Sequence, residues 1–189
     1  EYFIEKIDDT YKLTVKGKIA SNIHECNCLV FAEIIYDKYL DDLNVNDLVS
    51  FMSCFTNISI QDDFKYLNPE RNVDLMKIFN ELTNKYNDIE CQYQIDTGND
   101  IEFHYDIMTE CYDWCKANNE SECLEITNRL LDKGIFMGEF VKAILKINNI
   151  ANECITACEY MGNIKLSEQL NKIADVTLKF IILQQSLYL

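Results

Sequence analysis

The strongest constraint in this sequence is a helical repeat of apolar residues in its last third. Its members are spaced alternately by four and three residues over about six turns. They are Phe140, Ile144, Ile147, Ala151, Cys154, Cys158 and Met161. Residues with this spacing share one face of an α-helix. The segment therefore predicts a long helix with one buried face, ended by Gly162 and Asn163.

Similar apolar stripes predict helices along most of the chain, and capping residues mark where several of them begin. The predicted helices cover residues 28–39, the segment after Asn44, a long segment starting at Asn68 and Pro69, residues 103–115 and residues 122–133. The polar residues 96–100 are expected to form a turn or bend. A last stripe from Leu166 to Leu187 predicts a helix that packs antiparallel to the one before it.

The scarcity of turn residues favours helices over a many-stranded sheet. Proline occurs once and glycine five times, and neither Asn-Gly nor Asp-Gly, the usual hairpin turns, is present. We therefore predict one all-α domain over residues 1–189, a bundle of about six or more helices that ends in a long antiparallel helix hairpin. Residues 1–18 are open to two interpretations, strand or extended lead-in.

Composition limits the classes of function. The net charge of −15 argues against a protein that coats nucleic acid, so any such contact must be local. Nine cysteines, eight of them in apolar helical segments, favour a reducing intracellular compartment. No apolar run is long enough for a membrane span, and no membrane partner is expected. Because the chain begins at Glu1 without methionine, we expect it to be part of a longer or processed protein.

No catalytic motif is visible in the sequence. It lacks the glycine-rich loops that bind phosphates and the elbow that carries a nucleophilic serine. His24, Cys26 and Cys28, with the cysteine pairs of the helical stripes, raise a zinc hypothesis, but their spacings favour core positions. Three functions stay open on these grounds: a nucleic-acid-handling domain, an acidic helical protein-interaction module and a free-standing helical enzyme.

Several phrases, taken in order, resemble a known family. They are residues 13–20 (LTVKGKIA), 53–55 (SCF), Trp114, 134–142 (GIFMGEFVK) and 185–189 (QSLYL). Together they resemble the DSHCT domain, the helical C-terminal domain of Ski-like, exosome-associated DExH-box RNA helicases. The resemblance covers nearly everything after Leu13. It implies that the last phrase is the natural C-terminus of the family and that residues 1–12 lead in from a preceding helicase domain.

The resemblance also implies function and partners. The domain is expected to contact and guide single-stranded RNA during 3′-to-5′ unwinding for RNA processing or degradation. It implies that ATP and magnesium bind to the motor domains of the parent helicase. The missing motifs and the cysteine spacings predict that this chain itself holds no cofactor or metal and has no catalytic residue. The expected partners are single-stranded RNA, the motor domains of the same polypeptide and an exosome-like nuclease or adaptor.

One row of polar residues is the candidate site. Lys142, Lys146, Asn149 and Glu153, here called the polar row, recur at helical spacing opposite the apolar stripe. Periodicity alone favours a solvated helix face. The resemblance implies instead that this is the ratchet helix of the family, with Lys142, Lys146 and Asn149 at the RNA-binding positions. The family usually has arginines where this chain has lysines, and lysine lacks the planar fork that binds two phosphate oxygens.

Overall fold

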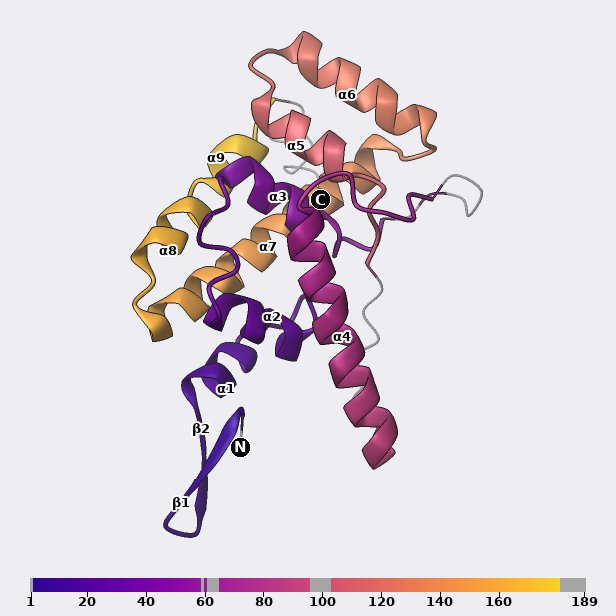
Figure 1. Ribbon diagram of the computed structural model, residues 1–189. Helices are drawn as coiled ribbons and strands as arrows, with labels where there is room; N and C mark the ends of the chain where they lie inside the picture. The colour runs from indigo at the N-terminus through magenta and orange to yellow at the C-terminus, as the bar shows by residue number, and fades with distance from the viewer. Residues whose placement is uncertain (1, 59, 61–64, 96–102, 181–189) are drawn as a thin grey trace.

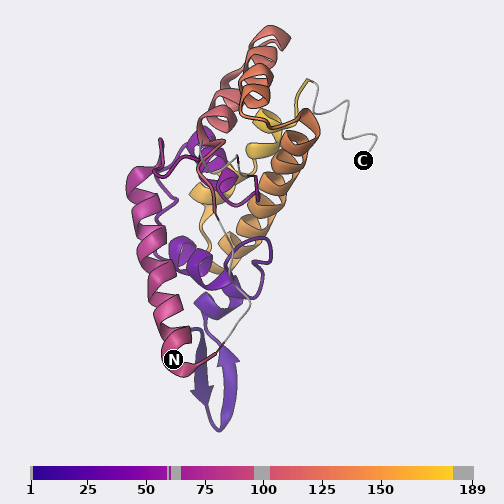
Figure 2. The same cartoon turned by 90° about the vertical axis from the view of Figure 1, so that its right-hand side faces the viewer.

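The computed structural model of the chain describes residues 2–58, 60, 65–95 and 103–180, which are mostly helical (Figure 1). The long helix α7 runs through the middle of the molecule. A small β-hairpin lies at one end, and α5 and α6 lie at the other (Figure 2). In chain order the elements are β1 (Ile4–Ile7), β2 (Thr10–Leu13), α1 (Val15–Ala20), α2 (Cys28–Tyr36), α3 (Val45–Ser53), α4 (Val73–Tyr93), α5 (Met108–Lys116), α6 (Glu120–Asp132), α7 (Met137–Met161), α8 (Ile164–Leu170) and α9 (Ile173–Thr177).

Helix α7 confirms the predicted long helix and its buried face. Six members of the predicted stripe are buried, and Met161 packs partly buried against the same core. The helix contacts α1, α2, α3, α6, α8 and α9. It ends at Gly162, whose φ of 64° is left-handed and therefore suits a residue without a Cβ. The most central element is thus the one that the sequence pattern predicts best.

A cluster of phenylalanines joins α2, α3 and α4 beside α7. Phe31 of α2 lies 4.9 Å from Phe55, ring centre to ring centre, and Phe55 lies 4.9 Å from Phe79 of α4. Phe103 continues the cluster at 5.3 Å from Phe79. Edge-to-face and tilted ring contacts of this kind add to the free energy gained from burying the apolar surface. The cluster explains how α4 is held by only a few buried residues.

Helix α4 is amphipathic and largely exposed along its length. Its buried residues are Leu75, Met76, Phe79 and Tyr86, and its C-terminal part extends toward the same end of the molecule as the β-hairpin (Figures 1 and 2). Among the described helices, none has the length and apolar content that crossing a membrane requires. The turn predicted at residues 96–100, beyond the end of α4, lies outside the described residues.

The structure corrects the predicted start of α4. The prediction for α3 was right, because the side chain of Asn44 accepts hydrogen bonds from the first turn of that helix. Helix α4, however, begins at Val73 and not at Pro69. The side-chain amide of Asn72 donates to the backbone oxygen of Asp47 at 2.9 Å. The segment before α4 is therefore used to tie the chain to α3 instead of extending the helix.

Helix α5 also begins later than predicted, at Met108 and not at Phe103. Phe103 belongs to the phenylalanine cluster, and the backbone N–H of His104 donates to the oxygen of Cys54 at 2.9 Å. This hydrogen bond joins two distant segments of the chain and uses a backbone N–H that a helix would need. Residues 103–105 are accordingly not helical. Helix α6 agrees with its prediction to within a few residues.

The long antiparallel helix hairpin predicted at the chain end is wrong over the described residues. Helix α8 packs on α7 but stops at Leu170, and the chain turns into the short α9. At the turn, the side chain of Asn171 donates to the oxygen of Ser167 at 2.7 Å. Beyond it, Trp114 of α5 donates to the oxygen of Thr177 at 3.0 Å and fixes α9 against α5. The predicted continuation to Leu187 lies outside the described residues.

The predicted all-α class also needs correction, because the N-terminal segment forms a β-hairpin. Strands β1 and β2 pair antiparallel, with Ile7 opposite Thr10. The two residues between them, Asp8 and Asp9, have φ values of 44° and 63°. Two left-handed residues make the tight turn that usually contains glycine, and aspartate tolerates this conformation better than most side chains. All eight strand residues are exposed, so the hairpin projects from the bundle.

The hairpin is attached to α1 by a close backbone contact. The N–H of Thr14 donates to the oxygen of Phe3 at 3.0 Å, and the hydroxyl of Thr14 caps α1 by accepting from the N–H of Gly17 at 3.1 Å. A Cβ on Gly17 would lie 2.0 Å from the oxygen of Phe3. A side chain at this position would therefore push the hairpin away from α1.

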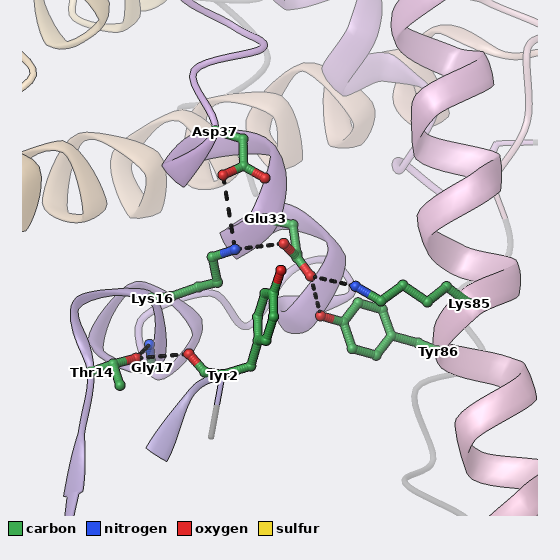
Figure 3. A network of polar contacts seen from close by, with 8 residues as sticks. All are labelled: Tyr2, Thr14, Lys16, Gly17, Glu33, Asp37, Lys85 and Tyr86. Carbon is green, nitrogen blue, oxygen red and sulfur yellow. Dashed lines mark hydrogen bonds and ion pairs between the residues drawn. The ribbon is translucent and has the colours of Figure 1, made fainter. Parts of the chain in front are cut away.

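A buried ionic network, here called the Glu33 network, joins α1, α2 and α4 (Figure 3). The carboxylate of Glu33 accepts from Lys16 at 2.6 Å, from Lys85 at 3.1 Å and from the hydroxyl of Tyr86 at 2.6 Å. The ring of Tyr2 lies under the Lys16 ammonium, 4.4 Å from it. Burial opposes ionisation of Glu33, but the three hydrogen bonds outweigh it and lower its pKa. Burial and the Glu33 charge raise the pKa of Tyr86.

Candidate nucleic-acid interface

The polar row lies along one side of α7, away from its buried stripe. Lys142 and Asn149 are exposed, whereas Lys146 and Glu153 are half-buried. Lys146, Asn149 and Glu153 touch other parts of the chain, as described below. Helix α7 holds all four residues on a rigid support, because the helix is packed against six other helices.

The loop between α1 and α2 lies across the C-terminal half of the polar row. One carboxylate oxygen of Glu153 accepts the backbone N–H groups of His24 at 3.0 Å and of Glu25 at 3.2 Å. The far end of the loop is fixed by Asn27, whose side chain accepts from the N–H of Val30 and caps α2. Glu153 therefore anchors a loop and is not free to meet a ligand.

Glu25 of this loop contacts two of the predicted RNA-binding residues. Its carboxylate accepts from the side-chain amide of Asn149 at 3.3 Å and lies 3.9 Å from the ammonium of Lys146. The ammonium of Lys146 also reaches the side-chain oxygen of Asn57 at 3.5 Å. Among the described residues, the ammonium of Lys142 has no hydrogen bond or ion pair. The structure thus divides the row into one open cation and two engaged donors.

Glu25 and Asn57 are the site residues that the sequence analysis missed. Both come from loops, and Glu25 is separated from Asn149 by 124 positions. Helical spacing relates residues within one helix and carries no signal for such contacts. Glu25 lies between His24 and Cys26, two residues for which the sequence raises only a zinc hypothesis.

Seven of the nine cysteines are buried in the hydrophobic core, whereas Cys28 is half-buried and Cys91 is exposed. Burial raises the pKa of Cys115 to about 12 and that of Cys158 to about 11, so both thiols are protonated at neutral pH. Their partners at i−4, Cys111 and Cys154, are also buried with raised pKa values. Within the described ranges, no group of three or more His, Cys, Asp and Glu side chains is placed to hold a metal ion.

Comparison with known proteins gives a family for the chain. The family model of the DSHCT (NUC185) domain matches residues 10–185. Among curated proteins, DExH-box ATP-dependent RNA helicase DExH9 of Arabidopsis thaliana is 27% identical over 180 residues, which cover 93% of this chain and 17% of that protein. The antiviral helicase SKI2 of Saccharomyces cerevisiae is 23% identical over 192 residues, which cover 98% of this chain and 14% of the relative.

A third relative, ATP-dependent RNA helicase mtr4 of Schizosaccharomyces pombe, is 19% identical over 183 residues, covering 94% of this chain and 16% of the helicase. The chain therefore spans less than a fifth of the length of these relatives. The family model, by contrast, covers nearly the whole chain. The chain belongs to the DSHCT domain family, and it matches the C-terminal region of Ski2/Mtr4-like DExH-box RNA helicases.

Proposed function

We propose that this chain is the RNA-guiding helical domain of an ATP-dependent RNA helicase, and that the polar row of α7 contacts single-stranded RNA during 3′-to-5′ unwinding. Membership of the DSHCT family supports the association with a helicase core. The relatives are RNA helicases, which supports RNA as the nucleic acid. ATP and magnesium then belong to the motor domains, because this sequence has no phosphate-binding loop.

The observation that carries the proposal is the exposed ammonium of Lys142. It lies one helical turn from Lys146 on the same side of a buttressed helix, and it has no polar partner among the described residues. An unpaired, solvated ammonium can bind a phosphate without first breaking an intramolecular ion pair. Its neighbours Lys146 and Asn149 would extend the contact along the RNA strand.

The proposed contact is a weak one. Two lysines neutralise about two phosphates, and the net charge of −15 repels RNA at long range. In a full-length helicase the motor domains would hold the strand already, so the row would act at a high effective concentration. An exosome-like nuclease or adaptor as a further partner stays a prediction.

Binding of a fluorescent single-stranded RNA to the 189-residue chain tests the proposal. Fluorescence anisotropy at low salt should give measurable binding, and Lys142→Ala should weaken it by roughly threefold to tenfold. The slope of log K against log salt should fall in magnitude by about 0.7, the value for one phosphate on a single strand.

The matched control is Lys77→Ala, which removes an exposed lysine from α4. It makes the same change of net charge on a helix that does not carry the polar row. Equal losses for the two variants would show that only overall charge matters, and would contradict the proposal.

The net charge of −15 favours a second candidate, an acidic module that binds proteins and not RNA. The same titrations separate the two functions. If the chain binds no RNA at low salt and Lys142→Ala changes nothing, the acidic module becomes the better account.

A further inference from the structure

The carboxylate of Glu25 occupies the place on the polar row where a phosphate would bind. It accepts from the amide of Asn149 and faces the ammonium of Lys146, the two donors next to the open Lys142. A phosphate oxygen is an anionic acceptor of the same kind and would use the same donors. The carboxylate and an RNA phosphate therefore cannot both hold these side chains.

The backbone of the loop that carries Glu25 is held by hydrogen bonds, whereas the Glu25 side chain can move away from Lys146 and Asn149. Glu153 holds the backbone N–H groups of His24 and Glu25, and Asn27 closes the loop at the start of α2. The Glu25 side chain itself is 32% exposed, and its ion pair with Lys146 is long at 3.9 Å. A long, partly solvated pair of this kind contributes less to stability than a short buried one, so an incoming anion can replace the carboxylate.

We propose that Glu25 is an internal competitor that sets the affinity of the α7 polar row for RNA phosphates. The inference rests on the proposed function and adds a residue that opposes binding. Lys142 would make the first contact, and Lys146 and Asn149 would become available only when the Glu25 carboxylate moves aside. The charges of Lys142 and Lys146 are balanced in number by those of Glu25 and Glu153, and the Glu25 carboxylate lies next to Lys146.

Neutralising Glu25 tests the competition. Glu25→Gln keeps the size of the side chain and removes its charge, and it should tighten binding of a uridine octamer by about threefold to fivefold. The log–log salt slope should steepen by up to about 0.7, because one further phosphate can be neutralised. In a Lys146→Ala background the same change should give no gain, since the cation under competition is then absent.

Glu159→Gln is the matched control. Glu159 is exposed near the C-terminal end of the same helix, outside the polar row, and the substitution changes the net charge by the same amount. An equal gain from Glu159→Gln would show general charge repulsion and overturn the proposal. A loss of affinity in Glu25→Gln would overturn it as well.

A second titration separates this inference from the proposed function. Inorganic tripolyphosphate is added to the ¹⁵N-labelled chain, and the side-chain amide resonance of Asn149 reports the local binding. If Glu25→Gln strengthens the tripolyphosphate response while RNA does not bind, the competitor stands and the RNA function fails. If RNA binds and depends on Lys142 but neither ligand responds to Glu25→Gln, the competitor fails and the RNA function stands.

Discussion

The molecule contains two lysine–glutamate pairs in opposite settings. In the Glu33 network, Lys16 and Glu33 lie 2.6 Å apart with side chains only 7% and 2% exposed (Figure 3). On the polar row, Lys146 and Glu25 lie 3.9 Å apart and are 21% and 32% exposed. The first pair joins the hairpin end of the bundle to α2 and α4. The second joins the loop between α1 and α2 to α7.

The difference in distance and exposure indicates that the first pair stabilises the fold and that the second can be replaced by a ligand. Removing one partner of a buried pair leaves a charge without water or counter-charge, at a cost of several kcal/mol. Breaking a long pair that water reaches costs less, because water replaces the lost partner. A lysine and a glutamate therefore stabilise the fold in the Glu33 network and form an exchangeable contact on the polar row.

The largest expected effect is the difference in stability loss when the glutamate of each pair is replaced by alanine. Glu33→Ala should lower the free energy of unfolding by about 3–5 kcal/mol, because Lys16 is then buried without its carboxylate. Glu25→Ala should lower it by no more than about 1 kcal/mol. Urea denaturation followed by circular dichroism measures both. Similar losses for the two variants would remove the distinction between the sites.

A smaller effect is expected from adding a methyl group beside the buried pair. Gly17→Ala places a Cβ against the oxygen of Phe3, which displaces the hairpin and the ring of Tyr2 that covers Lys16. We expect a loss of about 1–3 kcal/mol. Gly138→Ala, on the helix of the polar row, meets no atom within 4 Å and should cost nothing. Thermal unfolding of both variants checks the contrast.

The smallest effect concerns pH. The folded-state pKa of Glu33 is lowered by its three hydrogen bonds, which outweigh the opposing effect of burial. Its contribution to stability is therefore complete above the ordinary glutamate pKa of about 4.3 and is lost as pH falls through the lower folded value. The unfolding free energy of the native chain should fall more steeply between about pH 5 and 3 than that of Glu33→Gln. Parallel slopes would contradict the assignment.

The helical part of the fold could be predicted because it depends on local periodicity. The apolar stripe of α7 and the Asn44 cap of α3 are visible within a few residues of sequence, and both are confirmed. The failures arise from contacts between distant segments. His104 bonds to Cys54 and delays α5, and Trp114 bonds to Thr177 where the terminal helix was expected to continue. The Asp8-Asp9 turn was not predicted, because both aspartates adopt the left-handed conformation that usually indicates glycine.

The candidate site was predicted only in part for the same reason. Helical spacing places Lys142, Lys146 and Asn149 on one side of α7, and the structure agrees on their placement. Their role in binding RNA stays a prediction. Glu25 could not be found, because its loop and the helix are brought together by the packing of α1 on α7, which no local pattern encodes.

Photo-crosslinking tests the central claim most directly. The 189-residue chain is irradiated with a single-stranded RNA that carries 4-thiouridine, and the crosslinked peptides are identified by mass spectrometry. We predict crosslinks within α7 between Lys142 and Asn149, reduced in the Lys142→Ala/Lys146→Ala variant and kept in Lys77→Ala. Crosslinks confined to other elements, unchanged by the double substitution, would contradict the assignment of α7 as the RNA-contacting surface.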